Sequence, residues 1–161
     1  MKSKKTLILL AIFVLNTILP FGTVYAVTTV SSVTPSVTTI TDLLDGDLFS
    51  ISVVFDSPMD TTTNPTVMLF PDIVADGTLS YVGTSWSFDA MTYTIDYSIT
   101  DQNTVAPSVD VTILGGVDMG MPATPVGTHT ETGLFSVDMV APVLTESVVS
   151  VVPSVTTIND T

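Results

Sequence analysis

Residues 49–55 read FSISVVF, and residues 91–99 read MTYTIDYSI. In both stretches a large apolar side chain stands at every second position, which is the period of a β-strand with one buried face. These two strands decide the fold class, because no segment after residue 26 repeats its apolar residues at the 3.6-residue period of a helix. Further strands are predicted at 27–33 and 36–41, on either side of Pro35, and at 65–70, 79–82, 109–113 and 134–137.

The spacing of these segments predicts an all-β domain of about seven strands, if the two halves around Pro35 count as one split strand. Turn signals such as Asp76-Gly77 and Gly115-Gly116 separate the strands at roughly the 8–12-residue spacing of a β-sandwich. Val and Thr are abundant, whereas the strong helix formers are scarce. The composition therefore agrees with the periodicity.

A sequence repeat sets the domain organisation. PSVTTI at 35–40 recurs unchanged at 153–158, an offset of 153 − 35 = 118 residues. The offset is the size of one all-β domain, so it predicts one module followed by the first strand of another copy. Copies in tandem need chain ends that can be joined head to tail, which favours a sandwich over a closed barrel.

The first 26 residues have the pattern of a secretory signal peptide. Three Lys residues precede an apolar run over 7–21, and Val24-Tyr25-Ala26 offers small residues for cleavage after Ala26. A retained transmembrane anchor is the alternative, but the run contains Pro20 and is shorter than the roughly 20 residues of a bilayer span. We therefore expect a secreted or cell-surface protein with no membrane insertion after cleavage.

The expected organisation has three parts. Residues 1–26 are the signal peptide, residues 27–143 are one β-sandwich repeat, and residues 144–161 are a linker and the first strand of a truncated second repeat.

The charge of the chain limits its partners. All 3 Lys and Arg residues lie in the first 26 residues, and all 16 Asp and Glu residues follow them. Removal of residues 1–26 changes the formal net charge from −13 to 0 − 16 = −16. A chain without basic side chains cannot neutralise phosphates, so nucleic acid and anionic membranes are not expected partners. The chain also has no Cys, so no disulfide stabilises it.

Three carboxylates, those of Asp42, Asp45 and Asp47, share one predicted turn. Calcium prefers several oxygen ligands, which closely spaced carboxylates can supply. The spacing D-x-x-D-G-D differs from that of an EF-hand loop, so a further ligand must come from elsewhere, and Asp138 is the candidate. The alternative is that these carboxylates only cap turns at a sheet edge.

Six motifs in order carry a family resemblance: FSISVVFDSPMD (49–60), NPTV (64–67), GTSW (83–86), TYTIDYSITD (92–101), VDVTILGGVDMG (109–120) and FSVDMVAP (135–142). The series resembles a bacterial Ig-like repeat, a module found in tandem arrays of secreted or surface-anchored prokaryotic proteins such as large adhesins and S-layer-associated proteins. The resemblance implies an Ig-like β-sandwich with a structural and adhesive role, no catalysis, and calcium that rigidifies the array.

The same resemblance implies partners and further site positions. Neighbouring Ig-like repeats and cell-surface or matrix ligands are the expected partners. Asp118 lies in a G-x-x-D-x-x-G-like turn and Asp138 in an F-S-x-D-x-x-x-P-like domain junction, and both are candidate metal ligands.

Other functions have weaker signals in the sequence. Catalysis is not expected, because His129 is the single His and no Ser has an evident base. Trp86, Tyr93 and Tyr97 could form a carbohydrate platform, but the phase of the two Tyr residues with Ile95 places them on the core face. The main alternative to an adhesive module is a filament subunit, because residues 148–160 repeat the first strand and could replace it in a neighbouring molecule; the carbohydrate-binding module is the weaker alternative.

Overall fold

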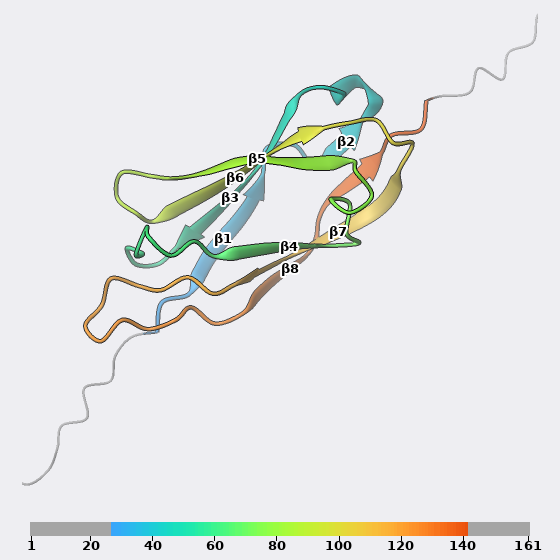
Figure 1. The fold of residues 1–161 in the computed structure, drawn as a ribbon. Helices are drawn as coiled ribbons and strands as arrows, with labels where there is room; N and C mark the ends of the chain where they lie inside the picture. Colours follow the sequence, from blue (N-terminus) through green and yellow to red (C-terminus); the bar gives the residue numbers. More distant parts are fainter. Residues whose placement is uncertain (1–26, 142–161) are drawn as a thin grey trace, which may run out of the picture.

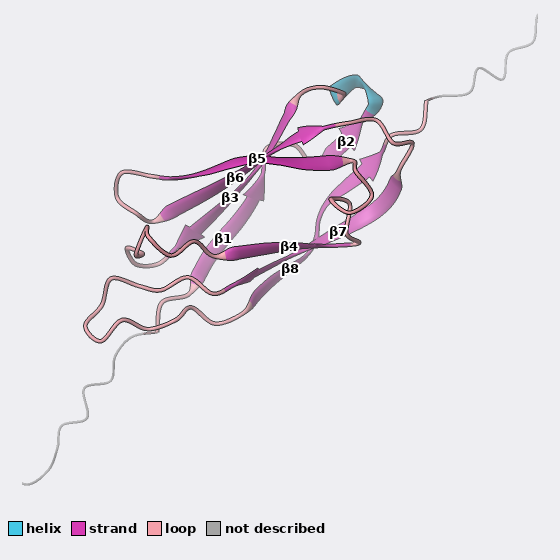
Figure 2. Cartoon of the chain, viewed as in Figure 1, coloured by secondary structure: helices cyan, strands magenta, loops and turns pink. Residues whose placement is uncertain are grey.

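A computed structural model describes residues 27–141 of the chain. They form eight strands and one 3₁₀ turn, and no α-helix occurs in this range (Figures 1 and 2). The elements are β1 (Val30–Pro35), β2 (Thr39–Thr41), η1 (Asp42–Leu44), β3 (Leu48–Phe55), β4 (Thr66–Phe70), β5 (Leu79–Trp86), β6 (Thr92–Ile99), β7 (Val105–Leu114) and β8 (His129–Asp138). The prediction of an all-β domain is confirmed.

The strands form two four-stranded sheets, which pack face to face. One sheet has the order β1-β3-β6-β5 and the other has the order β2-β8-β7-β4. All pairs are antiparallel except β2 with β8, which is parallel. The predicted split of the first strand is confirmed, because β1 pairs with β3 in one sheet and β2 pairs with β8 in the other.

The core comes from the alternating residues. Phe49, Ile51, Val53 and Phe55 are fully buried, and Tyr93 and Tyr97 are each only 3% exposed. Phe49 of β3 meets Phe135 of β8 across the two sheets, with ring centroids 4.7 Å apart. The prediction that both Tyr residues belong to the core is therefore confirmed.

Three strands are longer than the sequence pattern predicts. β5 continues past Val82 to Trp86, because a bulge between Tyr81 and Gly83 shifts the alternation without ending the pairing with β6. β7 starts at Val105 and is irregular between Ala106 and Val109. β8 starts at His129, and Gly133 with φ 63° interrupts its pattern.

The described chain enters and leaves the domain at opposite ends. Residue 27 lies beside the long β7–β8 loop, and residue 141 lies beyond β2 and the end of β8 (Figure 1). Within residues 27–141 no helix is long and apolar enough to cross a membrane. The predicted signal peptide (1–26) and the predicted linker with the first strand of a second repeat (144–161) lie outside the described residues, as do residues 142 and 143.

Candidate functional site

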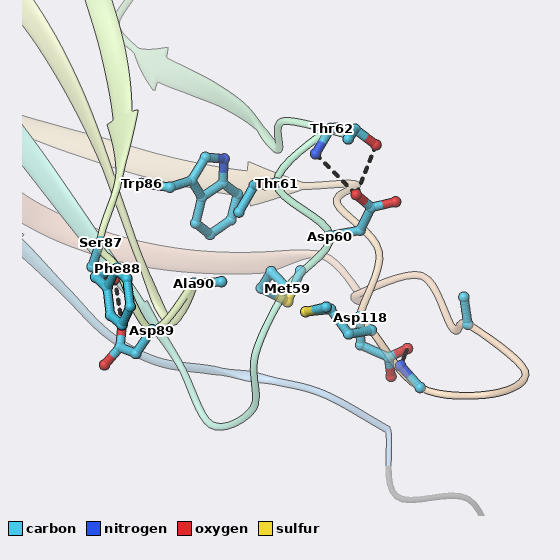
Figure 3. A pocket seen from close by; sticks show the side chains of 13 residues that line it. Met59, Asp60, Thr61, Thr62, Trp86, Ser87, Phe88, Asp89, Ala90 and Asp118 are labelled. Atoms are coloured by element: carbon cyan, nitrogen blue, oxygen red, sulfur yellow. Dashed lines mark hydrogen bonds between the residues drawn. The ribbon is translucent and has the colours of Figure 1, made fainter.

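Three loops at the end where residue 27 enters surround an open hollow of about 980 Å³ (Figure 3). They are the β3–β4 loop (56–65), the β5–β6 turn (87–91) and the β7–β8 loop (115–128). Loops at one end of a β-sandwich are where such domains commonly bind partners. A second hollow, beside Val67 and Tyr81, is about 330 Å³, a third of this volume.

Backbone hydrogen bonds tie the three loops together. The Met59 N–H donates to the Ala90 carbonyl (2.9 Å), the Asp60 N–H to the Val117 carbonyl (2.8 Å), and the Met119 N–H to the Pro58 carbonyl (3.1 Å). Met59 is fully buried beneath them. The hollow is therefore held by main-chain contacts between all three loops, which gives it a preformed shape.

Asp118 organises the β7–β8 loop. It is only 7% exposed, and its Oδ1 accepts hydrogen bonds from the N–H groups of Gly120 (3.0 Å) and Thr124 (2.9 Å). Its Oδ2 accepts from the hydroxyls of Thr124 (2.5 Å) and Thr28 (3.2 Å). The Thr124 hydroxyl, with the Thr124 N–H next, lowers the pKa of Asp118. This carboxylate is engaged by its own loop and by Thr28, near the first of the described residues, which accounts for its burial without a metal.

Asp60 and Asp89 place negative charge on the rim of the hollow (Figure 3). Asp60 Oδ1 accepts from the Thr62 hydroxyl (2.7 Å) and N–H (2.9 Å), and these bonds lower its pKa. Asp89 Oδ1 accepts from the Ser87 hydroxyl (2.5 Å) and the Met91 N–H (3.1 Å), with the same effect on its pKa. Both rim carboxylates stay ionised well into the acid range. Sequence reasoning missed them, although the turn patterns D-x-T at 60–62 and S-x-D at 87–89 are visible.

The apolar surface of the hollow comes mainly from Trp86, Phe88 and Met119, since Met59 is fully buried beneath it. Phe88 is fully exposed. Trp86 packs at a tilt against Tyr93 (centroids 5.0 Å apart) and Phe55 (5.9 Å), and its indole N–H donates to Asn64 (3.0 Å). The expectation that Trp86 packs as an anchor agrees with these contacts, since it lies partly buried against the core. Apolar surface beside ionised carboxylates suits groups that are both apolar and cationic.

Four of the five predicted metal ligands lie at the other end of the domain. Asp42 begins η1, Asp45 and Asp47 follow it, and all three precede β3. Asp138 ends β8, and it pairs in register with Thr41, the residue before Asp42. The structure thus brings Asp138 to the same end as the predicted turn, whereas Asp118 lies at the opposite end beside the hollow.

The carboxylates at this end do not converge on one point. Among residues 27–141, no group of three or more His, Asp or Glu side chains is placed to hold a metal ion. Asp45 Oδ1 accepts from the Asp101 N–H (2.9 Å), so Asp101 is a further carboxylate of this end that sequence reasoning missed. Asp42 Oδ1 is shielded from solvent and has no hydrogen-bond partner within the described part of the chain. Such an oxygen fits a cation ligand, but a complete site requires additional donors.

His129 belongs neither to the hollow nor to the group of predicted calcium ligands. It lies at the start of β8, and its Nε2 is 3.0 Å from Oε1 of Glu131 on the same strand. Neither residue lines the hollow.

Comparison of the sequence with protein-family models and with curated proteins, and of the fold with solved structures, finds no significant match.

Proposed function

We propose that residues 27–143 are an Ig-like β-sandwich module that acts, without catalysis, as a spacer or adhesive repeat of a secreted or cell-surface protein. Two observations together carry the proposal. The described chain enters at one end of the sandwich and leaves at the other (Figure 1), and the sequence starts to repeat after 118 residues. A module of this shape can be joined head to tail with copies of itself.

Strand order supports the Ig-like assignment. The order β1-β3-β6-β5 corresponds to strands A-B-E-D of that fold, and β8-β7-β4 corresponds to G-F-C. The division of the first strand between the two sheets, as β1 and β2, fits the same scheme. The secretory pattern of residues 1–26 agrees with an extracellular location.

The hollow supports an adhesive role in addition to a spacer role. It lies at a loop-built end of the module, it is held by backbone contacts, and it combines Phe88 with the ionised Asp60 and Asp89. We propose that it takes apolar, positively charged groups of a surface or matrix ligand, since a negative rim repels anionic ones.

A tandem protein tests the spacer role. Two copies of residues 27–144 joined directly reproduce the natural period, because 144 − 27 + 1 = 118. Small-angle X-ray scattering is expected to give a maximum dimension about twice that of one copy. A compact particle in which the two copies fold back on each other would contradict the spacer role.

Calcium is the second part of the proposal. Copies joined head to tail bring the carboxylate-rich end with Asp42, Asp45 and Asp138 against the loops of the next copy, where a cation can relieve like-charge repulsion. Chelation is expected to lower the melting temperature of the tandem protein, and Asp45→Asn or Asp138→Asn to abolish this response. Asp96→Asn, in the middle of β6, is the matched control and should leave it intact. An unchanged melting temperature on chelation of the unmutated tandem protein removes calcium from the proposal.

A further inference from the structure

We propose that residues 147–160 of one chain can occupy the β1–β2 site of a second copy, and that residues 30–42 of each chain compete for this site and keep it closed. The inference does not rest on the Ig-like assignment or on the spacer role. It rests on what β1 and β2 contribute to the fold and on how much of that contribution the C-terminal segment repeats.

The buried side chains of the first strand all have identical counterparts. Val30 and Val33 are each 8% exposed, Ile40 is fully buried, and Val37 packs against the core. The corresponding residues at the 118-residue offset are Val148, Val151, Val155 and Ile158. The apolar contacts that β1 and β2 make with the two sheets can therefore be made equally by residues 148–158.

The differences fall where the site is open to solvent. Val149 and Val152 correspond to Ser31 and Thr34, which are both exposed, and Asn159 corresponds to the half-buried Thr41. Val has a higher strand propensity than Ser, and a change at an exposed position leaves the core unaltered. Asn159, by contrast, suits a strand less well than Thr41, so the two segments are about equal as strands.

The polar contacts repeat as well. Ser36 Oγ accepts from the Ser50 N–H (3.0 Å), the Thr38 carbonyl accepts from the Ser136 N–H (3.0 Å), and the hydroxyls of Thr39 and Ser136 are 3.0 Å apart. Ser154, Thr156 and Thr157 supply the same groups at the offset.

One contact does not repeat, and it sets the start of the exchangeable segment. Thr28 is only 3% exposed and donates to the Asp118 carboxylate. Its counterpart is Glu146, which would put a second carboxylate beside Asp118. The next pair is compatible, because Thr29 donates its hydroxyl to Asp56 (2.8 Å) and Ser147 also has a hydroxyl. The segment that fits therefore begins at residue 147.

Geometry directs this segment to another molecule. β2 and β8 are parallel with Thr41 beside Asp138, so the site starts, at Val30, at the end of the domain away from Asp138. The path from Thr41 back to Val30 covers 41 − 30 = 11 residues, or about 36–40 Å if extended. The linker from Asp138 to Val148 has 148 − 138 = 10 residues and reaches at most about 33–36 Å. Both figures are upper limits and differ by one residue, so a chain could fill its own site only with its linker close to full extension, whereas the site of a second copy carries no such restriction.

Residues 30–42 occupy the site in the isolated chain because they belong to the same chain as the strands that form it. A short tether corresponds to an effective concentration of about millimolar, far above a micromolar protein solution. Since both segments offer nearly the same contacts, exchange is expected only when the tethered one is weakened. The perturbation must therefore act on residues 30–42 and leave residues 147–160 unchanged.

The experiment uses the chain of residues 27–161 with Ile40→Asp, which places a charge at a fully buried position. Size-exclusion chromatography with light scattering is expected to give a ladder of folded oligomers. The matched control Ile158→Asp lies in the identical hexapeptide and should leave a monomer with the melting temperature of the unmutated chain. The double variant Ile40→Asp/Ile158→Asp should lose both the oligomers and the cooperative melting transition. The proposal would be overturned if the Ile40→Asp chain is monomeric, whether folded or not. It would also be overturned if the double variant forms oligomers to the same extent as Ile40→Asp alone.

A cross-link tests the register. Thr34 lies opposite Ser52 in the β1–β3 pair, so Val152 of a donor chain should lie opposite Ser52 of an acceptor. An Ile40→Asp chain with Ser52→Cys, mixed with one carrying Val152→Cys, is expected to form a mixed disulfide, because the chain has no other Cys. Ser150→Cys, two residues out of register, should cross-link far less. Equal cross-linking from both positions would overturn the assigned register. Neither outcome affects the scattering test of the spacer role.

Discussion

Phe49 and Phe135 provide the sharpest test of how the two sheets are held together. Both are buried, Phe49 at 0% and Phe135 at 3% exposure, and their ring centroids are 4.7 Å apart with the planes tilted by 50°. A tilted pair at this distance contributes about 0.5–1.5 kcal/mol beyond its buried area. The pair joins β3 of one sheet to β8 of the other, so this energy acts across the sandwich.

We expect Phe49→Leu and Phe135→Leu each to lower the free energy of unfolding by up to about 1.5 kcal/mol, because each keeps an apolar side chain but loses the ring. The double variant should lose about 0.5–1.5 kcal/mol less than the sum of the two, since either single change already removes the aromatic contact. The described domain has 141 − 27 + 1 = 115 residues. A domain of this size has a stability of about 6–17 kcal/mol, so the double variant stays folded.

The assay is urea unfolding followed by the fluorescence of Trp86, the single Trp of the chain. Its ring packs on Phe55 and Tyr93, so its emission reports on loss of the core. Phe88→Leu is the matched control: Phe88 is fully exposed, and its replacement should change stability by less than about 0.5 kcal/mol. The reasoning is refuted if the two buried changes are additive within about 0.3 kcal/mol, or if Phe88→Leu costs as much as they do.

Three further predictions concern ionisation and processing. Hydrogen bonds lower the pKa of Asp118 below its ordinary 3.8, so its stabilising contribution is present above that pH and is lost as the pH falls through the lowered value. The difference in melting temperature between the unmutated chain and Asp118→Asn should therefore shrink below about pH 4. A difference that stays constant with pH would contradict this. Burial raises the pKa of Tyr97 to about 12, so the fold should lose stability as the pH rises above 10.0. An absorbance titration should show one tyrosine that ionises at a higher pH than an ordinary one, and Tyr97→Phe should remove that step. If residues 1–26 are cleaved, the mature protein contains no Lys or Arg, and trypsin should leave it intact even after denaturation; any tryptic fragment of the purified protein would place the cleavage elsewhere.

The two ends of the domain differ in how far the sequence predicts them. The Asp42, Asp45 and Asp47 turn was predicted as a group, and Asp138 was assigned to it from a domain-junction motif; the structure places them at one end of the domain through the parallel β2–β8 pair. The hollow at the other end was not predicted. It is formed by three loops, each separated from the next by more than 20 residues of chain, and its shape depends on hydrogen bonds such as that from Met59 to Ala90.

By itself the sequence determined the all-β class, the faces of the long strands and the division of the first strand. Each of these follows from a local property: the two-residue period of FSISVVF and MTYTIDYSI, and the missing N–H of Pro35. The tertiary structure alone decided the order of strands in each sheet, the extension of β5 past its bulge, and the role of Asp118, which binds Thr28 from 90 residues away. The physical reason is that pairing and burial depend on the free energy of contacts between distant segments, and a local period carries no information about which segments meet.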